Sequence, residues 1–185
     1  MKRLASFLRA DRGSAATEMA LVFPFMLVLM FGAVELGNLF LDEHTLTKQV
    51  RDGARYASRL PLSDDFVCNT EVFEGDDDDA KDEIIKVTKD GVVSGTGQPR
   101  WTAYWSRTCN GATPTLKVDI RCVDKDDIDL DADGTTGIYS SLPGNEIPVV
   151  TVSGAVKYRS VLAAIGFDAT NICLRAESDV AMAGA

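Results

Sequence analysis

The longest pattern along the chain is an apolar run near the N-terminus. No side chain in residues 19–34 is charged or an amide, and the apolar character continues to residue 41 with only Glu35 and Asn38 as interruptions. As a helix, residues 19–41 would be roughly 35 Å long at about 1.5 Å per residue, which exceeds a bilayer hydrocarbon core of about 30 Å. Because a helix in a soluble core is seldom apolar on every side, the run predicts a membrane span.

A helical pattern continues beyond this run and ends near Pro61. Apolar residues recur at steps of seven, four, four and three, so that they share one helical face. They are Leu39, Leu46, Val50, Ala54 and Ala57. Pro61 is a helix-stop signal. We therefore expect one helix of about 45 residues, with its first half in lipid and its second half packed on an outer domain.

The rest of the chain predicts a small α+β domain. Residues 79–89 contain the apolar residues Ala80, Ile84, Ile85 and Val87 among charged ones, which predicts an amphipathic helix. Alternating β-branched residues between Gly or Pro boundaries predict four strands, and a short helix is expected before the last of them. The strands are Trp101–Arg107, Thr115–Val123, Ile147–Tyr158 and Leu174–Met182, and the short helix is Ser160–Ile165. An antiparallel sheet packed on the outer part of the long helix would bury one apolar face of each.

The distribution of charge predicts an orientation. The protein has 28 acidic and 19 basic side chains, a net charge of −9 at pH 7. This balance argues against a nucleic-acid partner, which would need clustered Lys and Arg. Four basic residues precede the apolar run, namely Lys2, Arg3, Arg9 and Arg12. The positive-inside rule then places the N-terminus in the cytoplasm and the bulk of the chain outside.

The sequence offers little for catalysis. His44 is the only histidine, which excludes a histidine-rich zinc site and leaves one candidate base for a Ser-His or Cys-His mechanism. It falls on the polar side of the long helix, where a solvated histidine is favoured. Neither G-x-S-x-G nor H-E-x-x-H occurs. We predict that the protein is not an enzyme and has no catalytic residue, and an anchored hydrolase is the weakest interpretation.

Four cysteines lie on the predicted outer side. They are Cys68, Cys109, Cys122 and Cys173. An even number of cysteines in an oxidising compartment predicts two disulfides, and three connectivities are open. No C-x-x-C spacing occurs, so a redox or zinc motif is not favoured.

Two acidic segments follow the long helix. Residues 74–79 form a charge run that we interpret as a solvated helix N-terminus, where acidic side chains are mildly favourable. The second segment places Asp129, Asp131 and Asp133 at alternate positions before Gly134, as at the start of an EF-hand loop. Ser140 replaces the bidentate glutamate of that motif. A polar turn is the favoured interpretation, with a Ca²⁺ loop as the alternative, and no other cofactor is expected.

The segment RGSAATEM at residues 12–19 resembles the processing site of type IV prepilins. In that family a membrane peptidase cuts after a glycine, and a glutamate stands fifth in the mature chain. The resemblance implies cleavage after Gly13, with Ser14 as the first mature residue and Glu18 as the fifth. Met19 stands where the family usually has phenylalanine.

Glu18 lies at the head of the apolar run, where a lone carboxylate is costly. Cleavage would create an α-amino group at Ser14, and Glu18 of a neighbouring subunit would neutralise it within lipid. Because each charge alone is expensive there, such a pair favours assembly. The alternative is an acid that only reaches the membrane interface. Glu35 and Asn38 are interpreted as marking the outer interface, with a second inter-helix contact as their alternative role.

Three spaced segments together resemble the TadE-like family, the pseudopilins of the bacterial tight-adherence (Flp pilus) system. The segments are RGSAATEMALVFP at 12–24, GAVELG at 32–37 and VRDGARYA at 50–57. The resemblance covers about residues 12–60. It implies a pilin-like fold and a place in the inner membrane. Its implied partners are a prepilin peptidase, other pilins or pseudopilins and the pilus assembly platform.

These observations predict three parts of the chain. Residues 1–13 are a cytoplasmic basic leader, residues 14–60 the transmembrane and membrane-proximal helix, and residues 61–185 a periplasmic or extracytoplasmic α+β domain. The hypothesis for function is a non-enzymatic pseudopilin-like component of pilus assembly. The alternative is a single-pass anchored domain that binds a ligand or Ca²⁺ and never enters a pilus. Cleavage after Gly13 distinguishes the two.

Overall fold

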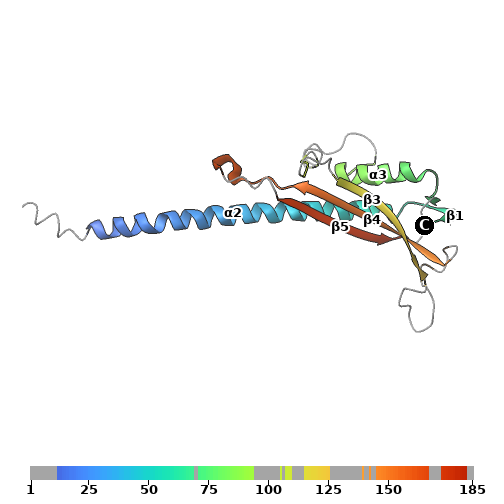
Figure 1. Cartoon of the computed structure of the whole chain (residues 1–185), viewed down its shortest axis with the longest axis horizontal. Helices are drawn as coiled ribbons and strands as arrows, with labels where there is room; N and C mark the ends of the chain where they lie inside the picture. Colours follow the sequence, from blue (N-terminus) through green and yellow to red (C-terminus); the bar gives the residue numbers. More distant parts are fainter. Residues whose placement is uncertain are drawn as a thin grey trace, which may run out of the picture. The chain divides into compact units, whose positions relative to one another are not determined.

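The protein is an α+β chain with one long N-terminal helix and two antiparallel sheets (Figure 1). The computed structural model describes residues 12–68, 71–93, 105, 107–109, 115–125, 139, 142, 145–166 and 172–182. Its contacts divide the chain into two compact units. The first comprises Met1–Phe40 and Ser160–Asp168, and the second comprises Leu41–Arg159 and Ala169–Ala185. The predicted fold class is confirmed.

Helix α2 runs without a break over Arg12–Ala57, a length of 46 residues. Pro24 lies inside it. After Ala57 the backbone amides of Arg59 and Leu60 bond back to Tyr56 and Ala57, so the last turn tightens before Pro61. The single long helix that the sequence predicts is therefore confirmed.

The first unit contains α2 up to Phe40 and the short segment Ser160–Asp168. That segment contains the 3₁₀ helix η3 (Leu162–Ile165), which Gly166 ends in the left-handed conformation with φ of 94°. The sequence predicted a short helix at Ser160–Ile165. The structure has a 3₁₀ helix that begins two residues later, at Leu162, and ends at the same residue. The Glu35 carboxylate accepts the backbone N–H groups of Val161 and Leu162 at 3.0 and 3.2 Å.

In the second unit, a three-stranded antiparallel sheet shares a core with the outer part of α2. Strand β4 (Glu146–Lys157) lies between β3 (Thr115–Asp124) and β5 (Cys173–Ala181). These three strands coincide with three of the predicted ones to within one residue at each end. Four of the five residues of the predicted apolar stripe belong to this core, namely Leu46, Val50, Ala54 and Ala57. The fifth, Leu39, is half-buried and belongs to the first unit. They cluster with strand residues including Leu116, Val118, Val150, Val152 and Val156.

The predicted strand at Trp101–Arg107 is wrong where it can be compared. Trp105 has helical backbone geometry and is buried in the core, and residues 101–104 and 106 lie outside the described part of the chain. Trp101, Tyr104 and Trp105 have the i, i+3, i+4 spacing of a helix face, which period-two alternation does not capture.

A hairpin that the sequence did not predict follows α2. Strand β1 (Leu62–Val67) pairs antiparallel with β2 (Glu71–Phe73), with an irregular register between the two. Helix α3 (Asp77–Asp90) comes next, capped by the Asp76 side chain, which accepts the N–H of Asp78 at 2.8 Å. The Asp77 carboxylate accepts the N–H groups of Val72 and Phe73 at 3.0 and 2.9 Å. Asp77, which belongs to the acidic run that the sequence predicted to be solvated, therefore connects strand β2 to the N-terminus of α3.

Gln49 is an anomaly in this core, and its replacement should stabilise the protein. Its side chain is 1% exposed, and neither its amide nitrogen nor its carbonyl oxygen has a hydrogen-bond partner among the described residues. A buried, unpaired polar group costs about 1–3 kcal/mol. We expect Gln49→Leu to raise the free energy of unfolding by about 1–2 kcal/mol in urea denaturation. Lys48→Leu, at the exposed neighbouring position, is the control and should change it little.

Candidate functional site

The first half of α2 presents apolar side chains outward on all sides. Residues 15–26 are exposed throughout, and Leu27 is half-buried. The exposed large apolar residues of the helix are Met19, Leu21, Val22, Phe23, Phe25, Met26, Val28, Leu29, Met30, Phe31, Val34, Leu36, Phe40 and Leu41. A surface of this extent needs a lipid or protein neighbour to cover it. Within the described part of the chain, α2 is the one helix long and apolar enough to cross a membrane, and none of its most apolar window is buried.

The predicted processing residues all lie in the first turns of α2. Gly13 and Ser14 have helical backbone, Glu18 is exposed one turn further along, and Met19 is exposed next to it. In a helix, residues 14 and 18 lie one above the other on the same face. Their role in processing and assembly stays a prediction.

In the second half of α2, Gly53 lies against Thr88 of α3. A side chain at this position would collide with the hydroxyl oxygen of Thr88, which is fully buried and donates to the carbonyl of Ile84 at 2.7 Å. One turn on, the Tyr56 hydroxyl donates to the Glu83 carboxylate at 2.9 Å. Burial raises the pKa of Tyr56, and its hydrogen bond to the Glu83 carboxylate and that group's negative charge raise it further. The hydroxyl therefore stays protonated and continues to donate.

Gly53→Ala is expected to destabilise the second unit. Overpacking costs about 1–3 kcal/mol, whereas alanine gains about 1 kcal/mol of helix propensity over glycine. The net effect should be a lower midpoint in urea denaturation. Gly37→Ala is the matched control, because a Cβ there meets nothing within 4 Å. Combining Gly53→Ala with Thr88→Ala removes the nearest colliding atom, so the double variant should recover most of the loss. If it does not, the collision is not the cause.

The four cysteines form two disulfides within the second unit. Cys68 is joined to Cys122 with their Cα atoms 6.2 Å apart, and Cys109 is joined to Cys173 with a Cα separation of 5.9 Å. None of the four is free. These pairings select one of the three connectivities that the sequence left open. The first bond ties the hairpin to β3, and the second ties residue 109 to the start of β5.

Thiol titration tests both bonds. Protein extracted from membranes under alkylating conditions should expose no thiol before reduction and four after it. We expect the double variant Cys109→Ala, Cys173→Ala to lose about 2–4 kcal/mol of stability, which is typical of one disulfide. Two or more reactive thiols in the native protein would contradict the pairing.

The structure supports no metal centre among the described residues. The Glu146 carboxylate lies near the sulfurs of Cys68 and Cys122. Those sulfurs are joined to each other and offer no thiolate to an ion. Asp129, Asp131 and Asp133, the candidate Ca²⁺ ligands, lie outside the described residues, so a Ca²⁺ loop stays an untested alternative.

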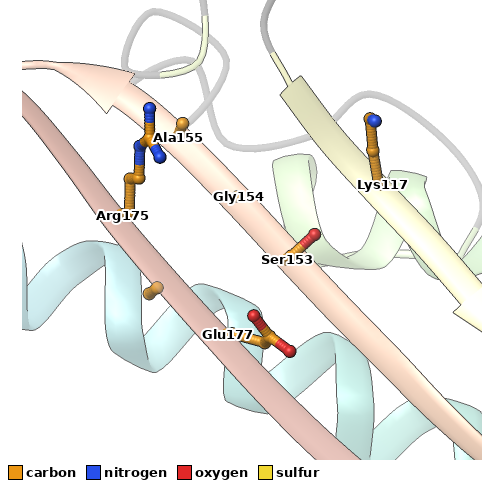
Figure 2. A pocket seen from close by; sticks show the side chains of 7 residues that line it. Lys117, Ser153, Gly154, Ala155, Arg175 and Glu177 are labelled. Carbon is orange, nitrogen blue, oxygen red and sulfur yellow. The ribbon is translucent and has the colours of Figure 1, made fainter.

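A shallow depression of about 440 Å³ lies on the three-stranded sheet (Figure 2). The register aligns Lys117, Ser153 and Glu177 across the three strands, and Arg175 lies opposite Ala155. The small side chains of the central strand leave the hollow, and the longer ones from the edge strands border it. The residues that line the hollow include no histidine. Its chemistry is that of a polar sheet surface.

The described residues thus form an apolar helix suited to membrane anchoring and an α+β unit that contains two disulfides. A family model described as TadE-like protein matches residues 13–55. The resemblance inferred from the sequence is therefore confirmed over this segment. The match and the apolar helix together suggest a membrane protein associated with the Tad pilus. No curated protein and no solved structure matches the chain.

The matched segment contains both halves of α2. Its first part is the exposed apolar helix, and its second part, up to residue 55, supplies Leu46, Val50 and Ala54 to the core and Gly53 to the contact with α3. Sequence reasoning identified the apolar stripe but not the role of Gly53. The small residues at 53, 54 and 57 were the available signal, because small side chains permit close packing of a helix against its neighbours.

Proposed function

We propose that this protein is a non-enzymatic, pseudopilin-like component of tight-adherence pilus assembly. A prepilin peptidase cuts it after Gly13, so that Ser14 becomes the N-terminal residue and Glu18 the fifth. The apolar half of α2 then holds the protein in the bacterial inner membrane, where it meets other pilins or pseudopilins and the assembly platform. Residues 61–185 form its periplasmic or extracytoplasmic domain.

The observation that carries this proposal is the continuity of α2 from an exposed apolar half into a half that packs in a folded core. The helix has 46 residues, and Leu46, Val50, Ala54 and Ala57 bind its outer part to the sheet. A subunit built this way offers its apolar helix to neighbours while its folded unit stays outside the bilayer. The TadE-like match over residues 13–55 supports the same role.

The charges and cysteines support the orientation. Lys2, Arg3, Arg9 and Arg12 precede the span and favour a cytoplasmic N-terminus. The two disulfides belong to a unit that follows the span, and disulfides persist in oxidising compartments such as the periplasm. Both observations support an α+β unit that lies outside the cytoplasm.

Deletion and complementation test the proposal in the bacterium of origin. We expect a strain that lacks the protein to lose tight-adherence pili in electron micrographs and to attach poorly to surfaces. The wild-type gene should restore both, whereas a version without residues 14–40 should restore neither. Normal piliation of the deletion strain would overturn the proposal and favour the anchored binding domain.

A further inference from the structure

Glu35 is the charged residue inside the apolar part of α2, and the structure gives it a specific partner. Its carboxylate accepts two backbone N–H groups, from Val161 at 3.0 Å and Leu162 at 3.2 Å. These residues are 126 and 127 positions away in the sequence, in the connection between β4 and β5. Both partners belong to the same compact unit as α2 up to Phe40.

The part of the β4–β5 connection that Glu35 holds is apolar, although polar residues flank it on both sides. Residues 161–167 (VLAAIGF) contain no charged, amide or hydroxyl side chain. Val161 is 49% exposed, and Ala163 is exposed as well. A solvent-facing turn between two strands usually carries Gly, Asn, Asp or Ser, so this composition is unusual for a loop in water.

The level of Glu35 along α2 lies within the apolar part of the helix. Beyond it, Leu36, Phe40 and Leu41 are still exposed apolar residues, at 51%, 55% and 69%. Leu41 is six residues further on, a distance of about 9 Å at about 1.5 Å per residue. If these residues face lipid, a segment bonded to Glu35 reaches the same level of the bilayer.

The two hydrogen bonds lower the free-energy cost of placing both partners near the hydrocarbon region of the bilayer. A lone carboxylate is expensive near the hydrocarbon region, and so is a backbone N–H without a partner. The first N–H groups of a helical turn have no acceptor within the turn. Glu35 supplies that acceptor, and the bonds are of the stronger, charge-assisted kind. Among residues 28–40, Glu35, Asn38 and Leu39 are the half-buried positions, at the spacing of one helix face.

We propose that Val161–Gly166 is a second membrane contact, an apolar turn that inserts into the outer interface of the bilayer beside α2 and is fastened there by Glu35. This inference rests on the proposed membrane span of α2. Its ligand is a phospholipid surface. The supporting observation is that an exposed apolar turn is hydrogen-bonded to Glu35, within a helix that is apolar and long enough to cross a membrane.

Photo-crosslinking of the full chain in vesicles of phosphatidylethanolamine and phosphatidylglycerol tests the proposal. Benzoylphenylalanine is placed at Val161, at Leu29 within the span or at Val93, one position at a time. Val93 is the matched control, a valine 42% exposed in the second unit. Lipid adducts are measured by mass spectrometry after irradiation. We expect the yields at Val161 and Leu29 to exceed the yield at Val93 several-fold.

Substitution of Glu35 gives the second arm of the experiment. Glu35→Ala should lower the lipid adduct at Val161 several-fold and leave the adduct at Leu29 unchanged, whereas Glu35→Gln keeps an acceptor oxygen and should lower it less. Adducts at Leu29 but none at Val161 above the Val93 level would overturn this inference alone. A crosslink from Val161 to a second copy in place of lipid would also overturn it. No lipid adduct at Leu29 would overturn the membrane span and the inference with it.

Discussion

Glu18→Ala is expected to abolish incorporation into pili while leaving the protein folded in the membrane. In the proposed assembly, Glu18 neutralises the α-amino group of Ser14 of a neighbouring subunit. Removing one partner of a buried ion pair leaves the other charge unpaired and costs about 3–5 kcal/mol, which is enough to reduce association more than a hundredfold. Insertion should survive, because the span becomes more apolar.

Affinity purification of wild type and variant from membranes measures this effect. We expect the variant to be recovered from the inner membrane in normal amount and to lack the other pilus components. Glu43→Ala is the matched control, since Glu43 is an exposed acid on α2 beyond the apolar run. Equal recovery of pilus components with the Glu18 variant would show that Glu18 is only an interfacial acid.

Gly13→Leu is expected to block processing completely. A prepilin peptidase must approach the backbone at the scissile bond, and glycine permits this because it has no side chain. The variant should accumulate as a precursor that retains residues 1–13, visible as a larger intact mass. Pilus assembly should fail as well, because no amine forms at Ser14 to pair with Glu18.

A leucine elsewhere in the helix provides the control. Gly37 lies on α2 with open space around its Cα, so Gly37→Leu should be processed normally. If the Gly13 variant is processed normally, the cut does not lie after Gly13.

Much of the fold could be predicted from local patterns. The apolar run and the stripe from Leu46 to Ala57 predicted one continuous helix, because the run has the length of a membrane-spanning helix and the stripe follows the 3.6-residue repeat. Strand alternation predicted β3, β4 and β5 to within a residue at each end. Helix α3 extends the prediction by two residues at its start, since Asp76 is the capping residue. In each case a short stretch of sequence contains the whole signal.

Other features could not be predicted from local sequence patterns. The hairpin β1–β2 was missed because its first strand contains Asp64 and Asp65, which resemble a loop, and its second strand has three residues. The disulfide pairing follows from the tertiary fold alone, since every connectivity was open. The bonds from Glu35 to residues 161 and 162 join positions about 126 residues apart. No local pattern identifies that partner.

The N-terminus of the mature wild-type protein tests the central claim most directly. The protein is purified from the membranes of piliated cells, and its intact mass and first residues are determined by mass spectrometry. Cleavage after Gly13 predicts a chain that begins at Ser14 and carries Glu18 as its fifth residue. A chain that still contains residues 1–13 would contradict the pseudopilin role and favour an uncut membrane anchor.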